Sequence, residues 1–120
     1  MVSARLLEVL TRGDGAGAFA GDDAVDGCAE HPVCGDRVQL SVRRDGDRVL
    51  AVRWRASGCP AVTAVAALCA KVLCDVPRAE VAPVLQAAIA AHGGLARHER
   101  HAESVVLRAL DDALVGAGGG

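Results

Sequence analysis

The sequence predicts an α+β domain in which helices pack on one face of a small antiparallel β-sheet. Residues 37–43 and 49–56 alternate apolar and polar side chains, which is typical of strands with one buried face. Residues 61–73 are instead apolar almost all round and contain no Gly or Pro, as expected for a buried helix. Because the strands come first along the chain and the helices follow, a sheet covered by helices on one side is favoured.

The N-terminal part of the chain is expected to contribute one short helix and one edge strand. Leucines recur at helical spacing over residues 3–10, behind a serine that can act as the N-cap. The Gly- and Ala-rich residues 13–21 are expected to be flexible, with Phe19 as their one anchoring side chain. Residues 22–30 are acidic and rich in turn formers, and a short edge strand is expected at 24–25.

The two alternating segments are expected to form a hairpin, because Asp45-Gly46 between them is a typical turn sequence. Arg53 and Arg55 lie on one face of the second strand, which is expected to be solvated. The opposite, buried face is expected to carry Leu50, Val52, Trp54 and Ala56.

The first long helix is expected to begin at Pro60, since the missing N–H of proline is not needed at the first helical position. Cys59 then lies at the N-cap, where the positive end of the helix dipole favours a thiolate, and is expected to be reactive. Cys69, one turn from the end of the same helix, is expected to pack in the core.

Two further helices are expected over residues 78–91, divided near Pro83, and over residues 97–115. The buried stripe of the last helix is expected to consist of Ala102, Val106, Ala109, Leu110 and Ala113. Residues 1–115 are therefore expected to form a single domain, followed by a flexible Gly-rich tail at 116–120.

Composition excludes several classes of partner. The net charge of −2 offers no basic surface for nucleic acid, and Trp54 and Phe19 are the only aromatic side chains on which bases could stack. No apolar run approaches the roughly 20 residues that span a bilayer, and the N-terminus lacks a signal-peptide pattern. We therefore expect a cytoplasmic protein, in which five cysteines favour metal, sulfur or redox chemistry over disulfides.

Two short motifs carry the candidate chemistry. Cys34-Gly35-Asp36 precedes the hairpin, and Gly58-Cys59 precedes the long helix, so each places a thiol at the end of an element. Taken singly, the first motif can be a turn in which Asp36 accepts backbone hydrogen bonds, and the second a simple helix start. His101 can likewise be an ordinary helix residue, and the other histidines, His31, His92 and His98, are interpreted as surface or loop residues.

Taken together, Cys-Gly-Asp before a hairpin, Gly-Cys before an Ala-rich helix and Leu-x5-His before the last helix resemble the U-type iron–sulfur cluster scaffolds (the IscU, SufU and N-terminal NifU group). The resemblance runs over about residues 3–114 and implies a SufE/NifU-like fold. It implies an iron or [2Fe–2S] site at Cys34, Asp36 and Cys59, with His101 as a further donor. It also implies sulfur supply by a cysteine desulfurase, delivery to apo iron–sulfur proteins, and no enzymatic turnover.

The sequence departs from the family pattern at the third cysteine. Residues 95–103 align without gaps on the family's Leu-Pro-Pro-x-Lys-x-His-Cys-Ser segment. His101 falls on the histidine, but Ala102 falls on the cysteine and Glu99 on the position that is often lysine. Alanine can neither bind metal nor accept sulfur, and Cys28, on the preceding loop, is a candidate replacement.

Three alternatives to a cluster scaffold remain open at this point. The remaining donors also suit Zn²⁺, which predicts a zinc-bound, SufU-like sulfur acceptor using Cys59 or Cys34. A degenerate member that only binds partners is the second alternative. A hydrolase that pairs Cys59 with His101 is the third, but no oxyanion-hole motif accompanies these residues.

Overall fold

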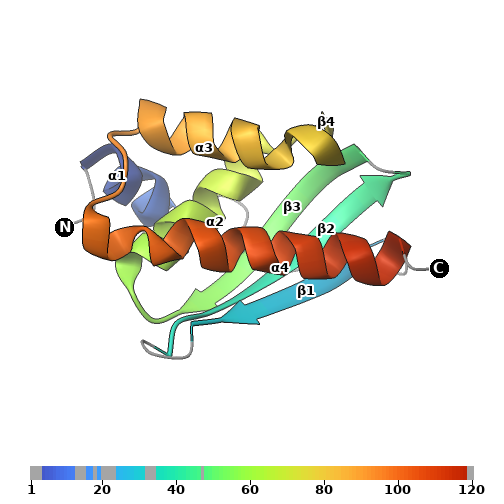
Figure 1. The fold of residues 1–120 in the computed structure, drawn as a ribbon, viewed down its shortest axis with the longest axis horizontal. Coiled ribbons are helices and arrows are strands. Elements are labelled where there is room, and N and C mark those ends of the chain that lie inside the picture. Colours follow the sequence, from blue (N-terminus) through green and yellow to red (C-terminus); the bar gives the residue numbers. More distant parts are fainter. Residues whose placement is uncertain are drawn as a thin grey trace.

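The computed structural model describes residues 4–12, 16, 17, 19, 24–31, 35–46 and 48–118 of the 120-residue chain. Four antiparallel strands form one sheet in the order β1-β2-β3-β4 (Figure 1). Their bounds are Ala24–Glu30 for β1, Arg37–Asp45 for β2, Arg48–Ser57 for β3 and Val76–Pro77 for β4. The edge strand expected at residues 24–25 is present as β1 and is longer than predicted.

Helices α2 and α4 cover one face of this sheet. α4 lies along β1 and β2, α2 packs on β3, and the two helices also contact each other (Figure 1). α1 and α3 pack against α2 from outside. The helices are α1 at Ala4–Arg12, α2 at Pro60–Val72, α3 at Val81–Ala91 and α4 at His101–Gly118, with 3-10 turns η1 at Arg78–Glu80 and η2 at Arg97–Glu99. The predicted α+β class is therefore confirmed.

The hairpin of β2 and β3 contains a bulge that the alternation did not predict. Arg43 pairs with Ala51 and Arg44 with Val49, so Leu50 is the extra residue of β3. The bulge changes which residues face the core, since side chains alternate along a strand. Val49 is fully buried, whereas Leu50 is 38% exposed. The prediction that Leu50 lies on the buried face is wrong, and Val52 and Trp54 are buried as predicted.

The helix ends differ slightly from the predicted ones. The break in the third helical region lies between η1 and α3 and not at Pro83, which sits in the first turn of α3 where its missing N–H is tolerated. α4 begins at His101, after η2, and continues to Gly118, so it enters the segment expected to be a tail. Its predicted buried stripe, from Ala102 to Ala113, is confirmed.

α4 can lie close to β1 because of Gly27. A Cβ at this position would overlap the backbone oxygen of Ala109 and the backbone nitrogen of Ala113. The glycine therefore lets the helix backbone rest directly on the edge strand. This contact fixes where α4, and hence His101 at its start, lies relative to the sheet.

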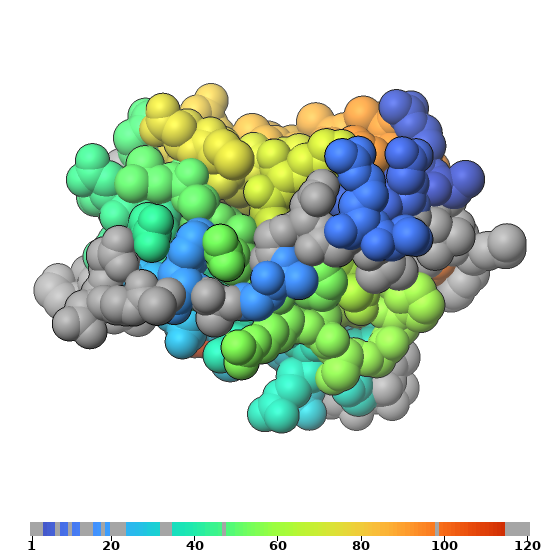
Figure 2. Space-filling model, turned by 180° about the vertical axis from the view of Figure 1, so that it is seen from behind, coloured from blue at the N-terminus to red at the C-terminus, as the bar shows by residue number. Residues whose placement is uncertain are grey.

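The face of the sheet away from α4 is partly covered by Phe19. The centroid of the Phe19 ring lies 4.4 Å from the guanidinium carbon of Arg43 and 5.0 Å from that of Arg53. The backbone N–H of Phe19 donates to Ser41 Oγ at 3.1 Å. Figure 2 shows the described N-terminal residues (blue) on this side of the molecule. Phe19 is an anchor as predicted, and Arg53 and Arg55 are exposed as predicted, although the Phe19 ring lies against Arg53.

In the part of the chain that the structure describes, no helix has the length and apolar character that crossing a membrane requires.

Candidate metal centre

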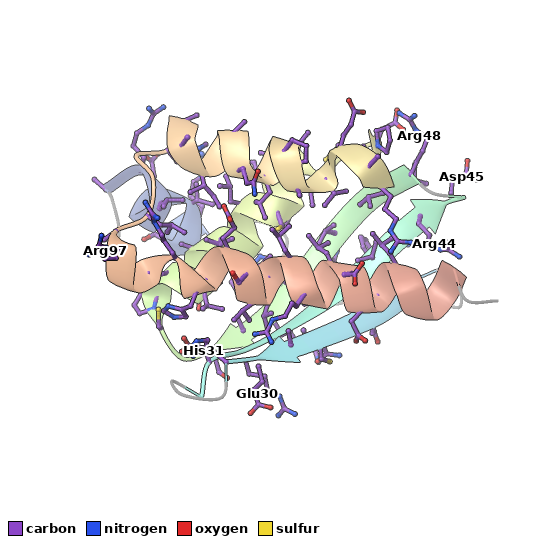
Figure 3. The ribbon with its side chains drawn as sticks, viewed as in Figure 1. Glu30, His31, Arg44, Asp45, Arg48 and Arg97 are labelled. Carbon is purple, nitrogen blue, oxygen red and sulfur yellow. The ribbon has the colours of Figure 1, made fainter. Side chains whose placement is uncertain are left out.

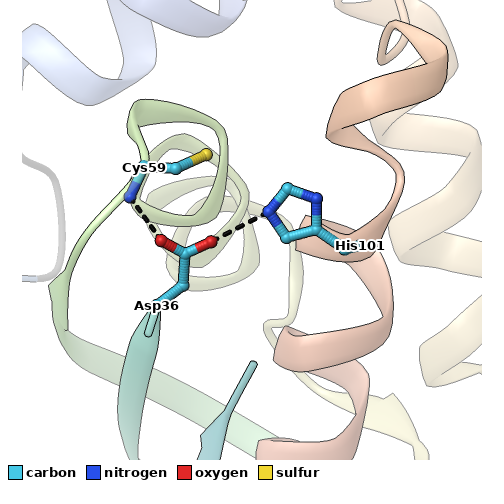
Figure 4. A group of neighbouring side chains, drawn as sticks. All are labelled: Asp36, Cys59 and His101. Carbon is cyan, nitrogen blue, oxygen red and sulfur yellow. Dashed lines mark hydrogen bonds and ion pairs between the residues drawn. The ribbon is translucent and has the colours of Figure 1, made fainter. Parts of the chain in front are cut away.

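Three side chains with metal-binding atoms meet at one end of the sheet. Asp36 immediately precedes β2, Cys59 lies between β3 and α2, and His101 is the first residue of α4 (Figure 4). The register explains the meeting, because Arg37 pairs with Ser57 and so brings the start of β2 beside the end of β3. Cys59 and His101, which are 23 and 65 positions from Asp36 along the chain, thus both contact its carboxylate.

Asp36 joins the other two residues through hydrogen bonds. Its Oδ1 accepts the backbone N–H of Cys59 at 2.7 Å, and its Oδ2 lies 2.8 Å from His101 Nε2. The carboxylate is only 2% exposed, and a buried carboxylate is stable only where such partners replace water. Because a carboxylate accepts, Nε2 of His101 is the donor, and in a neutral imidazole the lone pair is then on Nδ1.

Gly58 is required for this arrangement. Its φ of +112° lies in the region that side chains rarely adopt, and a Cβ there would overlap Oδ1 and the backbone of Asp36. A glycine before the cysteine is therefore needed, because only a residue without a Cβ leaves room for the Asp36 carboxylate to accept the backbone N–H of Cys59.

Cys59 is the N-cap residue of α2, as the sequence predicted. Its backbone is extended, with φ −70° and ψ 142°, Pro60 follows at the start of the helix, and its thiol makes no capping hydrogen bond. The partly buried sulfur therefore lies at the positive end of the helix dipole and does not satisfy the helix backbone.

The donor atoms of Asp36, Cys59 and His101 all lie within 4.8 Å of one another. Around a tetrahedral ion with bonds of 2.0–2.3 Å, donor atoms lie roughly 3.5 Å apart, so a small contraction would let the group hold one. One thiolate, one imidazole and one carboxylate form a mixed set that suits zinc or iron. The arrangement fits a metal that needs at least one more donor.

The sequence names two further candidate ligands, Cys28 and Cys34. Cys34 lies outside the described residues. Cys28 is exposed on the outer face of β1, opposite Gln39, in a hollow of about 350 Å³ that Arg37 and Arg55 also line. The described structure thus does not bring Cys28 to the site as a replacement for the missing thiol.

Ala102 and Glu99, the two departures from the family pattern, are both buried. Ala102 is fully buried in the core of the protein and supplies no donor. Glu99 is 5% exposed, and its Oε1 accepts the backbone N–H of Ala96 at 3.0 Å across the turn before α4. The acidic residue at the family's lysine position therefore contributes to the turn that leads into His101.

His31 is a loop residue, as the sequence predicts, and it also lies beside the site. Its ring is partly buried and lies 4.7 Å from the His101 ring, centroid to centroid. The only sequence signal was its position five residues before Asp36, in the stretch that also contains Cys34. His92 lies elsewhere, with Nδ1 2.8 Å from the carbonyl oxygen of Ala88.

The remaining cysteines outside the group differ in exposure. Cys69 is fully buried in α2 as predicted, and burial raises the pKa of its thiol well above the usual range. Cys74 is exposed, with Sγ donating weakly to the carbonyl oxygen of Lys71 at 3.9 Å.

Comparison with known proteins agrees with this geometry. The family model of the NifU-like N terminal domain matches residues 3–116. The chain belongs to this family. This match confirms the family resemblance that the Cys-Gly-Asp, Gly-Cys and Leu-x5-His motifs indicate. A search of curated proteins found no match to the sequence.

Solved structures share the fold of this NifU-like domain. One is assigned as an iron–sulfur cluster assembly scaffold protein for the SUF system of Fervidobacterium islandicum, with a TM-score of 0.73, 17% identity, and coverage of 93% of this chain and 95% of that one. A hypothetical protein gives 0.67 at 20% identity, covering 91% and 96%. The N-terminal part of a nitrogen-fixing NifU-like protein from Brucella abortus gives 0.59 at 19% identity, covering 96% and 81%. At these identities the likeness establishes the fold.

Proposed function

We propose that this NifU-like domain is an iron–sulfur cluster assembly scaffold or carrier. Its cargo is iron or a [2Fe–2S] cluster, bound through Cys34, Asp36, Cys59 and His101. Membership of the family supports the proposal, as does the likeness to a protein assigned as such a scaffold. The observation that carries it is the buried Asp36 carboxylate, which joins Cys59 and His101 into one group of donors.

Cys34 is included because chain connectivity keeps it near. It precedes Asp36 by two residues, so their Cα atoms are at most about 7 Å apart. A second thiolate would turn the mixed donor set into one with two sulfurs. Iron in biological clusters accepts imidazole in place of thiolate, as Rieske centres demonstrate, so His101 suits the same role.

Asp36 can serve the bound metal in two ways. A carboxylate can be a direct ligand of iron or zinc, or it can orient a ligating histidine by accepting its second ring N–H. Both of its oxygens already have partners in the group, at 2.7 and 2.8 Å, which favours the orienting role.

In this proposal the protein binds iron or the cluster, transfers it to other proteins and catalyses no reaction of its own. A cysteine desulfurase would supply the sulfur, and apo iron–sulfur proteins would receive the cluster, in the cytoplasm. Residues 1–115 would act as the single functional domain, and α4 extends beyond it to Gly118.

A second candidate is a zinc-bound acceptor of sulfur from the desulfurase. The observation that favours it is Ala102, which is buried and carries no donor where the family has its third cysteine. Two thiolates, an imidazole and a carboxylate complete a tetrahedral zinc site without that cysteine.

Anaerobic purification followed by measurement of iron, zinc and acid-labile sulfide separates these functions. Iron and sulfide in equal amounts, with visible absorption, support the scaffold. Stoichiometric zinc without colour supports the sulfur acceptor. If neither is bound after reconstitution with iron, sulfide or zinc, both are wrong, and the domain only binds partners.

A further inference from the structure

We propose that His31 is an additional metal ligand of this site and supplies the donor that Ala102 lacks. The inference rests on the proposed function, and it concerns a residue outside the Cys-Gly-Asp, Gly-Cys and Leu-x5-His motifs. It is carried by the juxtaposition of the His31 and His101 rings at the end of the sheet.

The backbone fixes His31 directly opposite Asp36. The N–H of His31 donates to the carbonyl oxygen of Asp36 at 2.8 Å, and the carbonyl oxygen of His31 accepts the N–H of Gly35 at 2.8 Å. These two hydrogen bonds pair the backbone of His31 with that of Gly35 and Asp36. His31 is therefore held beside the residue that organises the metal-binding group.

The side chain points toward the site and not into solvent. Glu30, the last residue of β1, is exposed and extends away from the helices (Figure 3). His31 follows it, on the other side of the strand end, and its partly buried ring contacts the His101 ring. The alternation of the strand thus directs the histidine to the first turn of α4.

The geometry of the two rings suits a shared ion. Two imidazoles bound to one tetrahedral ion through bonds of 2.0–2.1 Å have ring centres about 5 Å apart. The rings of His31 and His101 have centroids 4.7 Å apart and are tilted by 47°. This tilt excludes parallel stacking, and the spacing is close to that of a pair of ligands, so little movement would bring a nitrogen of each ring to one metal.

The chemistry of the group also calls for such a donor. With both oxygens of Asp36 hydrogen-bonded and its carboxylate orienting His101, the proposed ligands Cys34, Cys59 and His101 leave one position of a tetrahedral metal unfilled. A metal at this place therefore needs a further ligand close to His101, and the position that the family fills with a thiol is the buried Ala102. Imidazole is an accepted ligand for both zinc and iron, which makes His31 chemically suitable.

The first test needs no variant. Long-range ¹H–¹⁵N correlation spectra of the full chain, recorded while Zn²⁺ is added, follow the ring nitrogens of each histidine separately. We expect one nitrogen of His31 and one of His101 to move together to metal-bound shifts, at one equivalent of zinc. A spectrum in which His101 responds and His31 keeps its metal-free shifts would overturn the assignment.

The second test compares variants by competition for Zn²⁺ with a chromophoric chelator. His31→Asn is expected to weaken zinc binding at least about tenfold, because even residues that only support ligands change affinity 10- to 100-fold. His92→Asn, the matched control, is expected to bind as the unaltered protein does. Far-UV circular dichroism of each variant verifies that it is folded.

The outcomes separate this inference from the proposed function. If Cys59→Ala loses zinc while His31→Asn binds like the control, His31 is not a ligand and the scaffold site stands. If Cys59→Ala also retains full affinity, the proposed site itself is wrong, and the role of His31 falls with it.

Discussion

The two ends of α2 place the same kind of side chain in opposite surroundings. Cys59, at the N-terminal end, is partly buried beside a carboxylate and an imidazole. Cys69, near the C-terminal end, is fully buried among apolar residues, and burial raises the pKa of its thiol. One cysteine of this helix is therefore placed to bind metal, whereas the other packs in the hydrophobic core. The difference in their expected reactivity comes from their surroundings and not from the residue type.

The largest effect is expected at Gly58, on which the N-terminal end of the helix depends. Gly58→Ala introduces both backbone strain and overlap with Asp36, which together are expected to lower the free energy of unfolding by roughly 4 kcal/mol. Gly94→Ala is the control, since Gly94 also has a positive φ, of +74°, but open space at its Cβ. It should cost only about 1–2 kcal/mol, the penalty of a left-handed backbone for a residue with a Cβ. Urea unfolding measures both, and equal losses would mean that the contact with Asp36 is unimportant.

The next effect compares the two cysteines directly. Cys59→Ala should weaken Zn²⁺ binding at least about 100-fold, beyond what residues that only support ligands contribute. Cys69→Ala should leave zinc affinity within about twofold, because its sulfur lies in the core. Chelator competition measures both affinities. A similar loss in the two variants would show that Cys59 acts through the fold and not as a ligand.

Asp36→Asn tests the carboxylate that lies beside Cys59 at the N-terminal end of α2 and has no counterpart beside Cys69. The amide retains an acceptor for Cys59 but offers N–H instead of an oxygen to His101, so the ring proton of His101 should move from Nε2 to Nδ1. We expect zinc affinity to fall about 10- to 100-fold. Nitrogen-detected spectra report the tautomer. The control is Asp111→Asn, which removes an exposed partner of Arg78 and should change neither property.

The smallest effect is expected at the core end of the helix, in alkaline solution. Because the pKa of Cys69 is raised in the folded protein, the unfolded chain loses this proton first as the pH rises. Above about pH 9 the free energy of unfolding should therefore fall by about 1.4 kcal/mol per pH unit more than in Cys69→Ala. Cys74→Ala, at an exposed thiol, should behave like the unaltered protein in urea unfolding at each pH. An identical pH dependence in all three proteins would contradict the burial of Cys69.

Local pattern predicted most of the fold. Alternation identified β2 and β3, and Pro60 marked the start of α2 and hence the N-cap position of Cys59. The bulge at Leu50 could not be predicted, because it depends on how β2 and β3 pair and not on either strand alone. β1 was underestimated because its Gly27 weakens a strand pattern, although α4 requires that glycine.

The site was predictable only in part, because contacts between separate segments of the chain also decide which residues meet there. Asp36, Cys59 and His101 were identified from motifs and from the family resemblance, and the structure brings them together. His31 was missed because its position beside His101 arises from two backbone hydrogen bonds with Gly35 and Asp36. Cys28 was offered as a replacement ligand from its place in the sequence, whereas strand alternation turns it to the opposite face of the sheet.

Anomalous diffraction from crystals of the metal-loaded protein shows directly which residues hold the metal. We expect one strong peak at the end of the sheet, within bonding distance of Cys59 Sγ and a ring nitrogen of His101, for zinc and for iron alike. A metal bound instead at the exposed thiols of Cys28 or Cys74, with the Asp36 group left unchanged, would contradict the proposed site.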